Sequence, residues 1–165
     1  MADIANSKLL NDFEGISQLA NALVVLVKTE WNSGVVDELE AGCLSTFKKY
    51  GINTRTIVVP GAVEIPFAIQ QCWASNNAPA AFIALGCIIR GGTPHFEYVC
   101  QSVTQGITAL NLSMQVPVIF GVLTVDTMEQ AQERIGGIHG HKGDEAAITA
   151  VKMMILNQQL KEGNI

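Results

Sequence analysis

The residues best suited to chemistry follow an apolar segment in the middle of the chain. They are Gly91, Gly92, Thr93, Pro94 and His95. A glycine pair lets the backbone turn close to a ligand, threonine is a good helix N-cap, and proline fits the first helical position. The free N–H groups at such a helix start favour a phosphate. The helix dipole is positive at the same end and disfavours the cationic form of an imidazole, so a histidine there is neutral and can take a proton. The pattern predicts a phosphate site with a base beside it; the alternative is a plain helix cap followed by a surface histidine.

An aromatic residue and an amide stand together after an earlier apolar segment, at Trp31 and Asn32. An indole can stack on a planar heterocycle while the amide hydrogen-bonds the polar substituents of that ring. We therefore interpret the pair as one wall of a site for a heterocyclic ligand. The alternative is that Trp31 only packs beneath a helix start.

A glycine and a carboxylate follow the next apolar segment, at Gly61 and Glu64. The glycine permits close approach of the backbone to a ligand, and the carboxylate can accept hydrogen bonds from hydroxyl groups. The alternative is that Glu64 only balances the dipole of its own helix.

Two cations, Arg134 and Lys142, flank a glycine-rich loop at 136–141. Arginine offers a bidentate fork and lysine a point charge, so the two suit a phosphate. His139 and His141 lie in the same loop, but no third convergent ligand accompanies them, and we predict no metal site.

Strand and helix patterns alternate along the chain and must position these groups. We predict strands at 23–27, 54–59, 81–89 and 116–124, and helices at 36–50, 64–75, 94–114, from 127 and at 144–160. This alternation is typical of an α/β fold in which a parallel sheet is covered on both faces and ligands bind at the carboxyl ends of the strands. The strand at 81–89 is apolar almost throughout and should be central. Residues 76–77 should close the second helix, and residues 1–20 fall outside the alternation.

Length and composition limit the class of protein. The 165 residues predict a single domain, and a content of 48% hydrophobic but only 15% charged residues predicts buried subunit contacts, since about a quarter charged is usual. A net charge of -5 and the lack of a basic tract argue against nucleic acid as a partner. The apolar run at 22–27 is too short to span a membrane, and no signal peptide precedes it, so we expect a cytoplasmic protein.

The chain contains cysteines at irregular spacings and in apolar surroundings, namely Cys43, Cys72, Cys87 and Cys100. None forms a C-x-x-C pair, so we interpret them as reduced packing residues. Cys87 is the most notable because it lies just before Arg90 at the end of a predicted strand.

Together these motifs resemble the 6,7-dimethyl-8-ribityllumazine synthase family. The likeness extends from about residue 23 to residue 160. It rests on Trp31-Asn32, 59–66 (VPGAVEIP), 86–99 (GCIIRGGTPHFEYV), 117–124 (PVIFGVLT), 129–137 (EQAQERIGG) and 141–147 (HKGDEAA). The resemblance implies a three-layer α/β/α, flavodoxin-like fold with a central four-stranded parallel sheet.

The same resemblance implies condensation of 5-amino-6-(D-ribitylamino)uracil with 3,4-dihydroxy-2-butanone 4-phosphate, the penultimate step of riboflavin biosynthesis, without a metal or other cofactor. It makes His95 the proton-transfer residue and places the phosphate at Gly92, Thr93 and Arg134. The residues that it assigns to the pyrimidine and ribityl groups are Trp31, Asn32, Ala62, Val63, Glu64, Cys87, Ile88, Ile89, Phe120 and Lys142. Phe120, Arg134 and Lys142 are expected from the neighbouring subunit.

The resemblance also implies an assembly, a homopentamer with active sites between adjacent subunits. Some members of the family form a 60-subunit icosahedral shell, and the short turn at 135–141 permits one here. Residues 1–20 are expected to add a strand to a neighbouring subunit, and a functional association with riboflavin synthase is implied. Many members have asparagine where this chain has His141.

Two other classes of protein remain as alternatives. A non-catalytic flavin or lumazine binder would keep Trp31 but lose the phosphate residues, which this chain retains. A flavodoxin-like electron carrier would have a phosphate loop directly after its first strand, where this chain has an acid and a single nearby glycine.

Overall fold

Four parallel strands form a central sheet in the order β2-β1-β3-β4. The computed structural model describes residues 16–75 and 79–163. The strands are β1 (Leu23–Thr29), β2 (Asn53–Val59), β3 (Ala81–Ile89) and β4 (Val118–Val125). The predicted parallel sheet is confirmed, and β3 lies inside it as its apolar sequence indicated.

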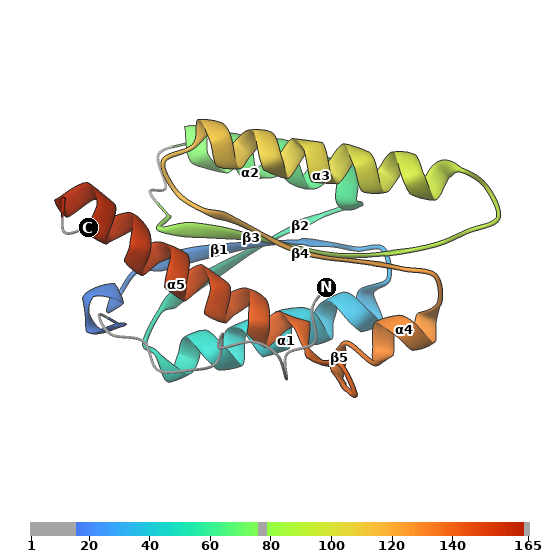
Figure 1. Ribbon diagram of the computed structural model, residues 1–165, viewed down its shortest axis with the longest axis horizontal. Coiled ribbons are helices and arrows are strands. Elements are labelled where there is room, and N and C mark those ends of the chain that lie inside the picture. The colour runs from blue at the N-terminus through green and yellow to red at the C-terminus, as the bar shows by residue number, and fades with distance from the viewer. Residues whose placement is uncertain (1–15, 76–78, 164–165) are drawn as a thin grey trace.

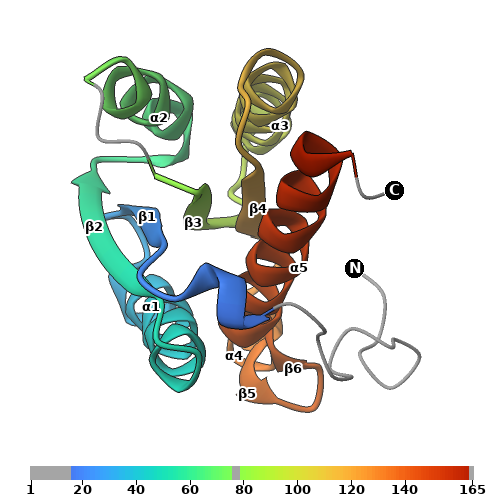
Figure 2. The same ribbon diagram turned by 90° about the vertical axis from the view of Figure 1, so that its left-hand side faces the viewer.

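Helices cover both faces of this sheet (Figures 1 and 2). The helices are α1 (Ser33–Lys49), α2 (Ile65–Ala74), α3 (His95–Ser113), α4 (Met128–Gln132) and α5 (Lys142–Glu162), with short 3-10 turns η2 (Ile16–Leu19) and η3 (Ala62–Glu64). Figure 2 looks along the strands and shows α2 and α3 on one face and α1 and α5 on the other. The expected three-layer α/β/α architecture is therefore confirmed.

The interior strands bury side chains on both faces, which explains their continuous apolar sequences. Along β1, Val24 and Leu26 pack in the core under α1 and α5, whereas Val25 and Val27 pack in the core under α2 and α3. Successive side chains of a strand point to opposite faces, so a single apolar run supplies both cores.

Helices α1 and α5 approach each other closely at two glycines. A Cβ added at Gly143 would run into the backbone of Leu39, and one added at Gly42 would run into the His141 ring. The Cys43 thiol donates to the Gly143 carbonyl oxygen at 3.1 Å. The start of α5 is thereby held against the middle of α1.

Three differences from the predicted elements affect the residues singled out in the sequence. Helix α3 begins at His95 with Pro94 as its N-cap, so Thr93 is not the cap, although its hydroxyl accepts a 3.5 Å hydrogen bond from the His95 backbone N–H. Helix α5 begins at Lys142 rather than at 144, because the His141 side chain caps it by accepting from the Asp144 backbone N–H.

The third difference concerns the glycine-rich segment before α5. It is a small antiparallel hairpin of β5 (Ile135–Gly137) and β6 (Gly140–His141), not a flexible turn. Positive φ angles at Gly136 and Gly140 let the chain reverse there. The N-cap predicted at Thr127 is confirmed, since its side chain accepts from the Gln130 backbone N–H, but the predicted capping box is only half formed, because the Gln130 side chain accepts from the Asp126 N–H and not from the Thr127 N–H.

Part of the N-terminal segment packs on its own chain. Residues 16–19 form η2, and Leu19 is buried in the core under α1 and α5. The strand expected from residues 1–20 is therefore not formed by these four residues, while residues 1–15 and the predicted helix end at 76–77 lie outside the described residues. No described helix has the length and apolar content that a membrane span requires.

Candidate active site

The loops that follow the strands meet at one edge of the sheet, at the right-hand end of Figure 1. The Trp31 backbone N–H donates to the Pro60 carbonyl oxygen at 3.3 Å, which joins the loops after β1 and β2. The Asn32 side-chain amide donates to the Cys87 carbonyl oxygen at 2.8 Å, which joins β1 to β3. Three of the motifs identified in the sequence are therefore in contact with one another.

Trp31 presents its indole to solvent, with 73% of the residue exposed. Gly61 lies between this ring and a carboxylate, because a Cβ added there would stand 3.6 Å from Trp31 Cδ1 and 3.0 Å from Glu64 Oε2. Beside them Val63 is exposed and Ala62 is buried. An open aromatic face next to a free backbone edge and a carboxylate suits a planar ring that carries hydroxyl groups.

Asn32 owes its position to an unusual backbone conformation. Its φ of 57° lies in the left-handed region, which asparagine tolerates better than most residues. One N–H of its amide is used on the Cys87 carbonyl, so the oxygen and the second N–H are left for a ligand.

The segment after β3 forms the second part of this edge. Residues 90–94 and Glu97 line an open cavity of about 310 Å³, and Gly92, Thr93 and His95 are all exposed. The 19-residue helix α3 begins beside this cavity, and the start of a helix favours a phosphate through its backbone N–H groups and its dipole.

Cys87, Ile88 and Ile89 border the site through the end of β3. Ile88 and Ile89 are half-buried, whereas the Cys87 side chain is 4% exposed and belongs to the core under α1 and α5. Burial raises the pKa of the Cys87 thiol to about 11. Only the backbone of Cys87 is therefore placed to contact a ligand, and its thiol is poorly suited to nucleophilic chemistry.

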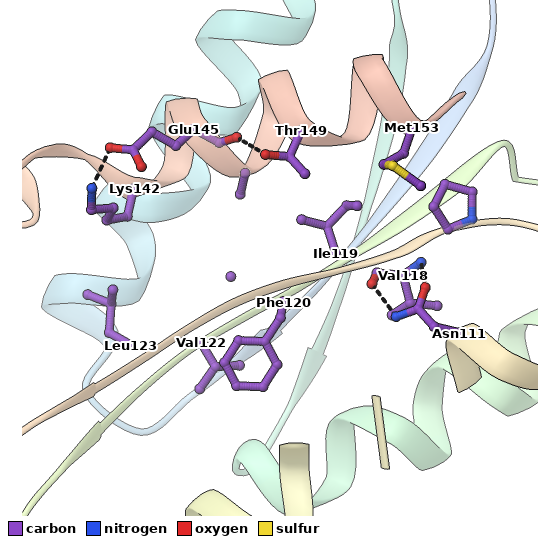
Figure 3. A pocket seen from close by; sticks show the side chains of 13 residues that line it. Asn111, Val118, Ile119, Phe120, Val122, Leu123, Lys142, Glu145, Thr149 and Met153 are labelled. Atoms are coloured by element: carbon purple, nitrogen blue, oxygen red, sulfur yellow. Dashed lines mark hydrogen bonds and ion pairs between the residues drawn. The ribbon is translucent and has the colours of Figure 1, made fainter. Parts of the chain in front are cut away.

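A second cavity, of about 470 Å³, lies along the free edge of β4 (Figure 3). Phe120 contributes an exposed ring from the strand, and Lys142 and Glu145 reach toward the cavity from α5. The Lys142 amino group lies 2.6 Å from the Glu145 carboxylate, and Lys142 itself is only 5% exposed. A buried cation paired in this way is fixed in position.

Arg134 follows α4, near the same end of the molecule as the loops after the strands. Its guanidinium donates to the Gln130 carbonyl oxygen at 2.7 Å and lies 3.8 Å from the Glu133 carboxylate. Its backbone oxygen accepts from the Lys142 N–H at 2.8 Å, which closes the β5–β6 hairpin between the two cations.

Sequence comparison assigns the chain to a family. The family profile for 6,7-dimethyl-8-ribityllumazine synthase matches residues 21–158. The chain belongs to the 6,7-dimethyl-8-ribityllumazine synthase family. It is accordingly an enzyme of riboflavin biosynthesis with lumazine synthase activity.

Individual lumazine synthases are similar over most of their length. The chain is 45% identical over 146 residues to the 6,7-dimethyl-8-ribityllumazine synthase of Parabacteroides distasonis, which covers 87% of this chain and 91% of that protein. It is 43% identical over 157 residues to that of Phocaeicola vulgatus, with 93% of each chain covered. It is 46% identical over 145 residues to that of Porphyromonas gingivalis, with 86% and 89% covered.

Within one lumazine synthase chain, the residues singled out in the sequence fall into two groups. The first, which we call the carboxyl-edge group, consists of Trp31, Asn32, Ala62, Val63, Glu64, Cys87, Ile88, Ile89, Gly92, Thr93 and His95. The second, which we call the β4-edge group, consists of Phe120 and Lys142 and lines the other cavity. Arg134 lines neither of the cavities described above, although its backbone contacts Lys142.

Three carboxylates at these sites were not singled out in the sequence, and one of them, Glu97, lines the cavity formed by residues 90–94. Glu145 stands three residues after Lys142 on α5, and this helical spacing was the available signal. Asp126 pairs with Arg90, and the signal was that each is the first residue after one of two adjacent strands.

Proposed function

We propose that the enzyme condenses 5-amino-6-(D-ribitylamino)uracil with 3,4-dihydroxy-2-butanone 4-phosphate and releases phosphate and water. The observation that carries this proposal is the meeting of three strand ends in the carboxyl-edge group. This edge brings together the exposed indole of Trp31, the Gly61 backbone with the Glu64 carboxylate, and the start of α3, where an anion can bind. These are the surfaces that a pyrimidine, a ribityl chain and a phosphate ester require.

In this proposal the pyrimidine stacks on Trp31, and Ile88 and Ile89 border its ring. Asn32 and the segment 62–64 hold the ribityl chain, to which Glu64 offers a carboxylate for the hydroxyl groups. The phosphate binds at Gly92 and Thr93, where backbone N–H groups and the positive end of α3 favour an anion.

The reaction consists of amine attack on the ketone, elimination of phosphate and ring closure, and each step moves protons. His95 is the proposed proton-transfer residue, because it is exposed at the start of α3, two residues after Thr93. The two substrates are already reactive, so the enzyme contributes mainly by holding them in position, with a smaller part from acid–base catalysis.

We further propose that each active site is completed by an adjacent subunit of a homopentamer. Phe120, Arg134 and Lys142 would come from that neighbour, and the β4-edge cavity would face the carboxyl-edge group of the next chain. The exposure of Phe120 and the separation of the two groups within one chain support this arrangement. The N-terminal arm, residues 1–20, would add a strand to a neighbour, and the short β5–β6 hairpin permits a 60-subunit icosahedral shell.

The proposal extends to the surroundings of the enzyme. We place it in the cytoplasm, where thiols stay reduced, because the described cysteines are unpaired and three of the four are buried. A functional association with riboflavin synthase, which would use the lumazine product, belongs to the same proposal.

The test mixes the purified enzyme with both substrates and follows lumazine absorbance beside the uncatalysed rate. We expect acceleration by the wild-type enzyme and its loss in Arg134→Ala, together with weaker binding of inorganic phosphate to that variant. A protein that binds lumazine or flavin tightly without accelerating the reaction would instead be a non-catalytic binder.

A further inference from the structure

We propose that Arg90 is a positioning residue that holds the phosphate-binding turn, and that it is not itself a phosphate ligand. The turn comprises residues 91–94 and leads from β3 into α3. The inference rests on the proposed function, because it takes Gly92 and Thr93 to bind the phosphate.

Arg90 contacts three side chains around the turn. Its Nε donates to Asp126 Oδ1 at 2.7 Å, and its Nη1 donates to Glu97 Oε1. Its Cζ lies 4.1 Å from the centre of the Phe96 ring, within the range of a cation–π contact. The hydrogen bond to Arg90 lowers the pKa of Glu97, as expected for a carboxylate held in an ion pair.

These contacts join both ends of the turn to the sheet. Ile89 and Val125 are paired in register, so Arg90 and Asp126 are the residues that directly follow two neighbouring strands. The Arg90 backbone N–H continues this pairing by donating to the Val125 carbonyl oxygen at 2.9 Å. Glu97 belongs to the first turn of α3. One guanidinium therefore ties the helix start to the ends of both strands.

The turn itself has little packing to hold it. A Cβ added at Gly91 or Gly92 would meet nothing within 4 Å. Residues 91–95 are all exposed in the described chain. Glycine has the greatest backbone freedom of all residues, so a glycine pair without packing needs support from its two ends.

The same geometry argues against Arg90 as a phosphate ligand. Its Nε and Nη1 donors are directed at two carboxylates, which together outweigh its single positive charge. A phosphate would have to displace Asp126 to reach Nε, and at the remaining N–H groups of Nη1 and Nη2 it would meet the excess negative charge of the two carboxylates. The side chains of Arg90, Glu97 and Asp126 are 43%, 54% and 61% exposed. Solvent therefore screens both ion pairs, and their effect on overall stability is small.

The test compares Asp126→Asn, Glu97→Gln and Arg90→Lys with the wild-type enzyme. We expect the KM for the phosphate substrate and the inhibition constant of inorganic phosphate to rise by about three- to tenfold, while the KM for the pyrimidine changes less than about twofold. Arg90→Lys should behave like the other two, because an ammonium keeps the charge but lacks the planar fork that reaches both carboxylates. In the double variant Asp126→Asn/Glu97→Gln the two effects should combine less than multiplicatively, since both act through one guanidinium.

Asp37→Asn is the matched control. Asp37 is similarly exposed, at 60%, and pairs with Lys28 at 2.9 Å on another part of the molecule. Its substitution removes a surface carboxylate from an ion pair. It should leave both KM values and the inhibition constant of inorganic phosphate unchanged.

If Arg90 instead bound the phosphate directly, the carboxylate variants would change the phosphate affinity in the opposite direction. Removing a carboxylate partner would then free the guanidinium, and Asp126→Asn and Glu97→Gln would bind phosphate more tightly. Tighter or unchanged binding in these variants overturns the positioning role. A wild-type enzyme that does not accelerate lumazine formation overturns the proposed function instead, so the two failures are distinguishable.

Discussion

At the scale of single residues, His95 is the side chain whose loss should affect the proton transfers. We predict that His95→Gln lowers kcat by about tenfold, which is less than the usual contribution of general acid–base catalysis, because the two substrates react even without the enzyme. Steady-state kinetics with both substrates measures this change, and inhibition by inorganic phosphate should stay within about twofold of the wild type as a control. Full turnover with phosphate binding intact would show that His95 is not the proton-transfer residue, although the enzyme assignment would stand.

The Cys87 thiol should react slowly with alkylating reagents, although the residue lies beside the site. Burial raises the pKa of its thiol to about 11, so at pH 8 only about one molecule in a thousand carries the reactive thiolate. Alkylation in the folded enzyme, followed by mass spectrometry, should therefore label Cys87 slowly at pH 8 and faster as the pH rises toward 11. The same chain unfolded in urea provides the control, since its exposed thiols have ordinary pKa values. Rapid labelling of Cys87 in the folded enzyme would contradict its burial in the core.

At the scale of elements, the packing of α5 on α1 determines where Lys142 lies. An added methyl group at Gly143 would collide with the Leu39 backbone, which cannot move as the end of a flexible side chain could. We predict that Gly143→Ala lowers the free energy of unfolding by about 1–3 kcal/mol, the usual cost of overpacking, and lowers activity as the start of α5 shifts. Urea denaturation followed by circular dichroism measures the loss.

The control for this prediction is Gly34→Ala on α1. A Cβ added at Gly34 would meet nothing within 4 Å, and the position has no positive φ. Alanine is a better helix former than glycine, so this variant should be at least as stable as the wild type. Equal destabilisation by both substitutions would show that the α1–α5 contact is not the cause.

Most of the elements could be predicted from hydrophobic patterning, and the exceptions have local causes. The four strands follow from apolar runs, and the long helices follow from apolar residues spaced three and four apart. The two kinds of element are distinguishable because the hydrophobic period of a helix differs from that of a strand. The start of α5 was placed too late because His141 is not a common N-cap, and its capping became visible only from its contact with the Asp144 N–H. The β5–β6 hairpin was missed because its strands have three and two residues, too few to show a pattern.

At the scale of the whole molecule, a shared active site predicts rescue between two inactive variants. We expect chains carrying Trp31→Ala and His95→Gln to be impaired in the carboxyl-edge group, and chains carrying Arg134→Ala to be impaired in the part that the neighbour supplies. When equal amounts of the two variants are reassembled into random pentamers, about a quarter of the sites should be intact. A site is intact only when the carboxyl-edge group of one chain and the contribution of its neighbour are both unmutated, and each condition holds in about half of the cases. Activity of the mixture measures the recovery.

The mixed assembly needs a control and a size measurement. Mixing the two variants without unfolding and reassembly should give little recovery, since the subunits would not exchange. Analytical ultracentrifugation should show a species of about 90 kDa for a pentamer, or a far larger one for a shell. Recovery no greater than the sum of the two separate variants would contradict a site shared between subunits.

The sequence by itself determined the family, the layered α/β architecture and the identity of the residues that could do chemistry. It could do so because strand and helix periods are local properties, and because motifs that follow strands in a parallel sheet must meet at one edge. Trp31, Asn32 and Glu64 were found in this way, and their loops lie together in the structure.

Only the tertiary structure decided which of these groups are free and which are already engaged. It joined Arg90 to Asp126 and Glu97, buried Lys142 against Glu145, and placed the Cys87 thiol in the core. It also separated Phe120 and Lys142 from the carboxyl-edge group, on a different edge of the sheet. The physical reason is that hydrogen bonds, ion pairs and burial depend on distances between residues far apart in the chain, and local patterning does not contain those distances.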